Sequence, residues 1–263
     1  MIKYRGSTGD IDAYLVMPED SSPHPGIVLI HEIFGLNDHI RDVADRMARE
    51  GYAVLAPHLF SSKHVPAGMT AENIQLTMQF MMSLPPEKQR DMGFVQEQLS
   101  KYDASKRGAI QSIMGVMFNL PRPKLADELV AGVDYLNSLS SVKAGKIGSV
   151  GFCFGGAMSA ELACSGKTAA TVIFYGQNPE PVERVRNING PILGLYGAVD
   201  KRINEHLHEL VKAFVDYDKI FEIVVYRGAA HAFFNNTGRN YNEEAASDAW
   251  ERVKAFFSKN LQN

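Results

Sequence analysis

Residues 146–158 read KIGSVGFCFGGAM and place Cys153, one of only two cysteines in the chain, between glycines. An apolar run precedes the cysteine and small, helix-favouring residues follow it, so we expect a strand that turns sharply into a helix. Glycines two positions from the cysteine let the backbone pass closely at such a turn. The helix N-terminus favours a thiolate there, which predicts that Cys153 is a nucleophile. A structural cysteine is the alternative, and we keep that interpretation for Cys164, which lies on an apolar helical face.

Short apolar runs and amphipathic segments alternate through the rest of the chain. The runs suit strands buried on both faces, so the alternation predicts a doubly wound, mostly parallel α/β sheet with helices on both faces. A polar turn between two earlier apolar segments predicts an antiparallel hairpin and brings the sheet to eight strands. The expected strands are 2–5, 11–16, 27–30, 52–56, 147–151, 171–175, 191–196 and 221–226, and the expected helices are 38–50, 125–139, 156–164, 203–216 and 242–257.

Residues 61–122 interrupt this alternation. They contain no convincing strand, and seven of the eleven methionines fall within them. Helices that simply pack on the sheet are one interpretation. The other is a cap over the active site, because methionine adapts to irregular surfaces. No stretch rich in Gly, Ser or Pro marks a domain boundary, so we expect residues 1–263 to form one domain with a helical insertion.

The composition predicts a compact, soluble protein. Hydrophobic residues make up 45% and charged residues 22%, and 27 basic against 30 acidic residues give a net charge of −3, so a nucleic-acid partner is not expected. No run approaches the roughly 18 apolar residues of a membrane span, and the N-terminus does not resemble a signal peptide. Two cysteines are too few for a disulfide framework, which favours a reducing, cytoplasmic setting.

A thiol nucleophile needs a base, and His231 is the best placed of the eight histidines. It follows the last expected strand, at the carboxyl end where open α/β sheets hold their sites. Asp200 follows the preceding strand and is the expected partner that orients the histidine. The chain order Cys153, Asp200, His231 is the nucleophile, acid, histidine order of α/β-hydrolases. The sequence therefore predicts a catalytic triad on three strand ends.

The segment HEIFGLN, residues 31–37, follows the first central strand, where α/β-hydrolases place one oxyanion-hole donor. The predicted donors are the backbone N–H groups of Phe154 and of a residue near Ile33. Glu32 is unusual at this point, because an unpaired carboxylate would repel the developing negative charge. It is either a surface glutamate or a group with its own role at the thiol.

Four segments together, HEIFGLN, GFCFGG, YGAVD and GAAHAF, resemble the dienelactone hydrolase family of α/β-hydrolases over most of the chain, except about residues 61–122. The resemblance implies an α/β-hydrolase fold and a triad of Cys153, Asp200 and His231. It also implies that Glu32 contacts the resting thiol and takes its proton when substrate binds. Ile33 and Phe154 match the oxyanion-hole positions of the family.

The resemblance implies hydrolysis of a small ester or lactone through an acyl-enzyme, with no cofactor and no metal. The family binds a substrate carboxylate with arginines, one of them a few residues after the histidine, whereas the first basic residue after His231 is Arg239. The sequence therefore leaves the substrate open, as it does the oligomeric state. The alternative function is a non-catalytic protein of the same fold that binds a small ligand or partner.

Overall fold

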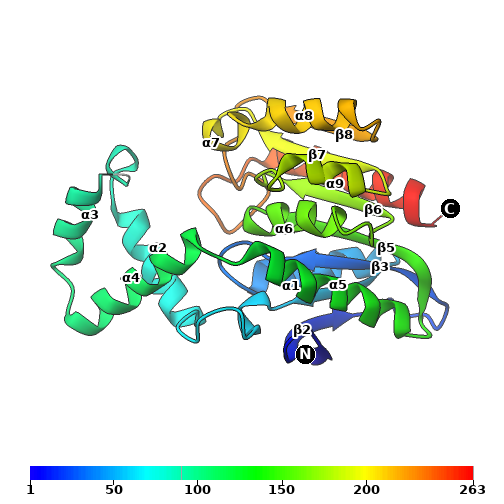
Figure 1. The fold of residues 1–263 in the computed structure, drawn as a ribbon, viewed down its shortest axis with the longest axis horizontal. Helices are drawn as coiled ribbons and strands as arrows, with labels where there is room; N and C mark the ends of the chain where they lie inside the picture. The colour runs from blue at the N-terminus through cyan, green and yellow to red at the C-terminus, as the bar shows by residue number, and fades with distance from the viewer. Residues whose placement is uncertain (90, 263) are drawn as a thin grey trace. The chain divides into compact units, whose positions relative to one another are not determined.

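The computed structural model describes residues 1–89 and 91–262, and in them eight strands form one sheet. The order is β1-β2-β4-β3-β5-β6-β7-β8. β1 and β2 run antiparallel to their neighbours, and every pair from β4 to β8 is parallel (Figure 1), so the predicted mostly parallel sheet is confirmed. The strands are β1 (Ile2–Arg5), β2 (Asp10–Val16), β3 (His24–Ile30), β4 (Ala53–Pro57), β5 (Val142–Phe152), β6 (Ala170–Phe174), β7 (Ile192–Gly197) and β8 (Phe221–Tyr226).

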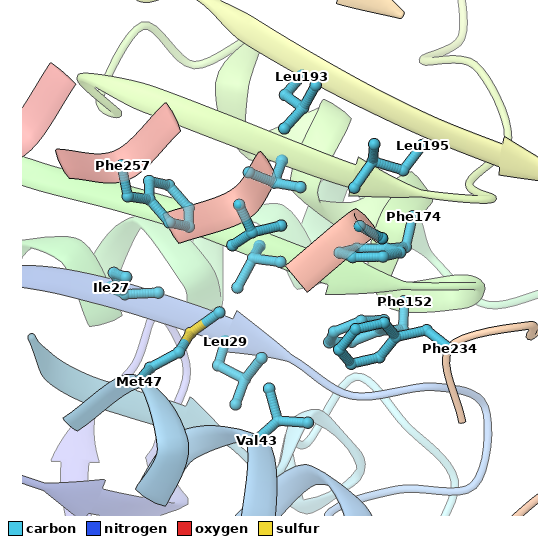
Figure 2. Packing of buried hydrophobic residues seen from close by; sticks show 14 of the residues in the cluster. Ile27, Leu29, Val43, Met47, Phe152, Phe174, Leu193, Leu195, Phe234 and Phe257 are labelled. Carbon is cyan, nitrogen blue, oxygen red and sulfur yellow. The ribbon is translucent and has the colours of Figure 1, made fainter. Parts of the chain in front are cut away.

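Helices cover both faces of this sheet. α1 (Asp38–Arg49) and α9 (Glu243–Phe257) share one buried cluster with Val172 and Phe174 of β6, part of which Figure 2 shows. α6 (Phe154–Ala163) and α8 (Leu207–Asp216) share another with Ile173. Alternate residues of a strand point to opposite faces, so one apolar run supplies both clusters. α5 (Arg122–Ser138) contacts α6 and β5.

One predicted helix is broken in the structure. The segment expected as a single helix over 203–216 begins earlier, as α7 (Lys201–Asn204), and resumes as α8 after Glu205 and His206. At the break, the Asn178 side chain donates a hydrogen bond of 2.7 Å to the His206 carbonyl oxygen. A residue distant in sequence thus satisfies the backbone where the helix stops, which local periodicity does not reveal. The remaining short helices are η1 (Leu59–Ser61), η3 (Val182–Asn187) and η4 (Ser258–Gln262).

Residues 63–121 form a separate compact unit. It contains α2 (Ala71–Ser83), η2 (Pro86–Lys88), α3 (Met92–Leu99) and α4 (Ala104–Phe118), and no strand among its described residues. Phe80, Leu99 and Ile110 belong to its own buried cluster. The segment is helical in its described residues, whereas its interpretation as an insertion into a single domain and as a cap stays a prediction. Across the described residues, no helix is long and apolar enough to span a membrane.

Helix α6 begins in direct backbone contact with the ends of two strands. A Cβ added at Gly155 would lie 2.2 Å from the carbonyl oxygen of Ile30, at the end of β3. One added at Gly151 would lie 1.9 Å from the carbonyl oxygen of Gly155. Behind this contact, the buried hydroxyls of Ser149 on β5 and Ser159 on α6 lie 3.0 Å apart. The two glycines therefore allow the close approach that places the first turn of α6 against the sheet.

Replacing Gly155 by alanine should lower the free energy of unfolding by about 3 kcal/mol or more, because the obstructing atoms belong to the backbone and cannot rotate away. Urea unfolding followed by circular dichroism measures the loss. Gly108→Ala is the control, because a Cβ added at Gly108 would have no other described part of the chain within 4 Å, and alanine favours a helix. A loss below about 1 kcal/mol for Gly155→Ala would contradict the close-contact interpretation.

Candidate functional site

The three predicted triad residues follow three strands of the parallel sheet. Cys153 comes directly after β5, Asp200 follows β7, and His231 follows β8. The carboxyl ends of parallel strands meet at one edge, where open α/β sheets bind their ligands. Asp200 and His231 are in direct contact there, and Cys153 interacts with the His231 ring. The structure thus brings the three side chains together.

Cys153 has a strained backbone conformation at the N-terminus of α6. Its φ is 57° and its ψ is −115°, values that side-chain-bearing residues rarely adopt. The described residues contain four non-glycine positions with positive φ, and Cys153, Tyr175 and Ala232 are three of them. Ala232 directly follows His231. Strain of this kind persists only where the surrounding structure imposes it, and here it gathers around one thiol.

Asp200 fixes the orientation of the His231 ring. The His231 Nδ1 lies 2.5 Å from Asp200 Oδ2, and the Asp200 side chain is buried. Burial alone would lower the pKa of His231, but hydrogen bonding to Asp200 and the interactions with Cys153 outweigh it and raise the pKa to about 10. The ring is therefore mainly imidazolium at neutral pH. A cation in this place stabilises a thiolate beside it.

Glu32 is fully buried, so its interpretation as a surface residue is wrong. Asn235 Nδ2 donates a 2.6 Å hydrogen bond to Glu32 Oε2, while Oε1 has no hydrogen-bond partner among the described residues. Burial raises the pKa of Glu32 to about 7, against the lowering effects of the Asn235 hydrogen bond and of His231. This carboxyl group can therefore exchange a proton near neutral pH.

Two backbone N–H groups lie at the predicted oxyanion positions without a protein acceptor among the described residues. Phe154 is the first residue of α6, where the backbone N–H has no partner within the helix. Ile33 lies in the loop after β3, and no described residue accepts a hydrogen bond from its N–H. Both donors are therefore free to bind an oxygen atom. Their role in catalysis belongs to the proposal below.

Sequence reasoning missed two residues of this site. Asn235, four positions after His231, supplies the polar partner of Glu32, and no motif marks it. Tyr175 directly follows β6, so its strand-end position could have identified it. Its ring centroid lies 5.1 Å from that of His231. Burial, with the nearby Glu32 and Cys153, raises the pKa of Tyr175 well above its ordinary value, so its hydroxyl stays protonated.

Other candidate groups do not join the site. Cys164 is buried, and its burial raises the pKa of its thiol to about 12. His206 and His208 are exposed. His39 lies in the first turn of α1, where it is buried and packs against the rings of Phe152 and Phe234. No group of three or more potential metal ligands occurs in the described part of the chain.

Replacing Glu32 by glutamine should flatten the pH dependence of stability. The folded pKa of about 7 exceeds the ordinary 4.5. Folding therefore binds a proton between these values, and stability falls as pH rises from 4.5 to 7. The difference, 7 − 4.5 = 2.5 pKa units, corresponds to a loss of about 3 kcal/mol in the free energy of unfolding of the wild-type protein. Glutamine does not titrate, so the variant should not show this loss. Urea unfolding at pH 4.5 and pH 8 measures it.

The exposed Glu19 supplies the matched control, because Glu19→Gln removes the same charge at a solvated position. Its stability should follow that of the wild-type protein at both pH values. Parallel pH profiles for wild type and Glu32→Gln would contradict the raised pKa.

Comparisons with known proteins match most of the length of this chain. The model of the dienelactone hydrolase family matches residues 11–261. A Saccharolobus solfataricus protein named as a carboxymethylenebutenolidase is 40% identical over 97% of this chain and 96% of its own. A Synechocystis protein of the same name is 30% identical over 96% and 93%. In fold, the chain resembles a dienelactone hydrolase-like promiscuous phosphotriesterase from metagenomic libraries, with a TM-score of 0.72, 24% identity and coverage of 99% and 97%. The chain belongs to the dienelactone hydrolase family.

Proposed function

We propose that this protein hydrolyses small esters or lactones through a covalent intermediate on Cys153. Membership of the dienelactone hydrolase family and the names of its relatives support a hydrolase. The observation that carries the mechanism is the 2.5 Å contact between Asp200 and His231 beside a thiol on a strained turn. These are the parts that nucleophilic catalysis requires, namely an attacking group, a base and a group that orients the base.

In the first half-reaction, the Cys153 thiolate attacks the carbonyl carbon of the substrate and forms a C–S bond. Glu32 has taken the thiol proton, and His231, held as imidazolium by its anionic partner Asp200, stabilises the thiolate. The carbonyl oxygen takes the electron pair and accepts hydrogen bonds from the Ile33 and Phe154 N–H groups. The tetrahedral intermediate then collapses. The C–O bond to the alcohol breaks, and His231 protonates the departing oxygen.

In the second half-reaction, His231 is neutral and removes a proton from water. The hydroxide adds to the thioester carbonyl, and the same two N–H groups stabilise the oxyanion. Collapse breaks the C–S bond and releases the carboxylic acid, and Glu32 returns its proton to the Cys153 thiolate, which regenerates the thiol. Every proton thus passes through groups at the carboxyl ends of the strands, and no step calls for a cofactor or a metal.

Glu32 controls when the thiolate forms. Its buried carboxylate is unfavourable beside a second negative charge, and its raised pKa of about 7 lets it accept a proton at neutral pH. We assign it the transfer of the thiol proton on substrate binding, as in the family. The neutral Asn235 amide contacts Glu32 in the stretch where the resemblance leads us to expect an arginine. A carboxylate on the substrate therefore has no cationic partner there, which leaves the dienelactone itself unassigned.

The proposed setting is the cytoplasm, with small molecules and not nucleic acid as partners. Cys153 and Cys164 are both free thiols, in keeping with a reducing compartment. The net charge of −3 gives no electrostatic attraction to a phosphate backbone.

Cys153→Ala should lower kcat/KM for p-nitrophenyl acetate and for simple lactones at least about a thousandfold, because no other group can form the acyl-enzyme. Cys164→Ala is the matched control and should stay within about threefold of the wild type. Iodoacetamide with mass spectrometry should label Cys153 well before the buried Cys164. The proposal is contradicted if the wild-type protein turns over no ester, lactone or thioester faster than Cys153→Ala does. The alternative, a ligand-binding protein of the same fold, would then be favoured.

Glu32→Gln should lower kcat at least about a hundredfold, because the amide cannot accept the thiol proton. The wild-type kcat/KM should rise with pH through an ionisation near 7, which is the raised pKa of Glu32, and the variant should lack it. Initial rates from pH 5 to 9 test both statements, with Glu19→Gln as the control. Full activity of the Glu32→Gln variant would contradict the role that we assign to Glu32.

A further inference from the structure

His31 joins two backbone segments at the edge of the site. It directly follows β3, and its side chain is fully buried. Its Nε2 lies 3.1 Å from the backbone nitrogen of Leu59, and its Nδ1 lies 2.6 Å from the carbonyl oxygen of Glu32. Because a backbone N–H can only donate, Nε2 is the acceptor and Nδ1 carries the proton. His31 therefore donates to the Glu32 carbonyl.

The ring stays neutral in this arrangement. Burial lowers the pKa of His31 to about 3, although the hydrogen bond to the Glu32 carbonyl opposes the shift. The same tautomer, with Nδ1 protonated, is thus present across the whole pH range in which an esterase is assayed. His31 is a fixed donor and not a titrating group.

The carbonyl that His31 holds belongs to the same peptide as the predicted oxyanion donor. The Glu32 C=O and the Ile33 N–H lie in one plane and point in opposite directions across a trans peptide bond. The backbone N–H of Gly35 also donates to the Glu32 carbonyl, at 3.2 Å. Two hydrogen bonds on the oxygen therefore set the direction of the N–H.

We propose that His31 is a positioning residue that orients the Glu32–Ile33 peptide so that the Ile33 N–H faces the oxyanion. This inference rests on the proposed function, because it needs a tetrahedral intermediate to stabilise. Packing alone would not require a histidine, since its ring contacts, such as the one with Phe60 at 4.8 Å, are open to phenylalanine. Burying the imidazole costs free energy, which its two hydrogen bonds offset, and both bonds go to the backbone.

The test separates attack at a carbonyl from attack at a saturated carbon. His31→Phe keeps a ring but removes both hydrogen bonds. Its kcat for p-nitrophenyl acetate should fall about tenfold to a thousandfold, up to the cost of losing an oxyanion donor outright, with KM changed less than about threefold. Alkylation of Cys153 by iodoacetamide forms no oxyanion, so its rate should stay within about twofold. His31→Gln, whose amide offers both an N–H donor group and a carbonyl acceptor, should recover most of the lost kcat.

His39→Phe is the matched control, because it replaces another buried histidine with the same residue. It should retain the wild-type kcat. If His31→Phe does not fold, His31→Met supplies the same comparison, since a flexible methionine fills irregular gaps and also lacks both hydrogen bonds.

An unchanged kcat in the folded His31 variant overturns the proposal. So does a loss of alkylation rate equal to the loss of kcat, because His31 would then act on the thiol. Failure of the proposed function gives a different result from failure of this inference. In that case, a protein that keeps His31 still shows the wild-type turnover after Cys153→Ala.

Discussion

The site depends on the contact between the backbone of α6 and the backbones of β3 and β5. Gly155 lies against the carbonyl of Ile30, and Gly151 lies against Gly155, at distances that no side chain permits. This contact places the first N–H of α6 beside the loop that leaves β3. It also leaves Cys153 between them in a left-handed conformation, which would be unfavourable without the packing around it. The same backbone contact therefore positions the proposed nucleophile and the two proposed oxyanion donors.

The charges around the thiol follow from this enclosed geometry. His231 carries a positive charge and Asp200 a negative one, so the net charge of this pair is zero before the thiol ionises. A charged Glu32 would add a negative charge in a buried place, and its closest polar partner is the uncharged amide of Asn235. An arginine there would hold the carboxylate ionised, whereas the amide leaves its pKa near neutrality. The choice of partner therefore sets when Glu32 can exchange its proton.

The sequence predicted the sheet, the helices on both faces and the residues at three strand ends, because apolar periodicity and turn glycines are local signals. It did not decide between a surface and a buried Glu32, since the hydrogen-bond partner of its carboxyl group, Asn235, is 203 residues away. The prediction of one unbroken helix over 203–216 failed for the same reason, because the hydrogen bond at the break comes from Asn178. Tyr175 could have been identified from its position at a strand end, but it is neither charged nor an expected nucleophile. Partners distant in sequence are what pattern reasoning lacks.

Glu32 connects the two requirements of the proposed chemistry within a single residue. We propose that its side chain accepts the thiol proton, while its carbonyl belongs to the peptide that carries the Ile33 N–H and is held by His31. A movement of this backbone would alter the ionisation of Cys153 and the oxyanion donor together. The segment is accordingly held by independent contacts, with His31 and the Gly35 N–H on the carbonyl and Asn235 on the carboxyl group. Because one loop supplies both functions, the thiolate and the means to stabilise its product are available in the same conformation.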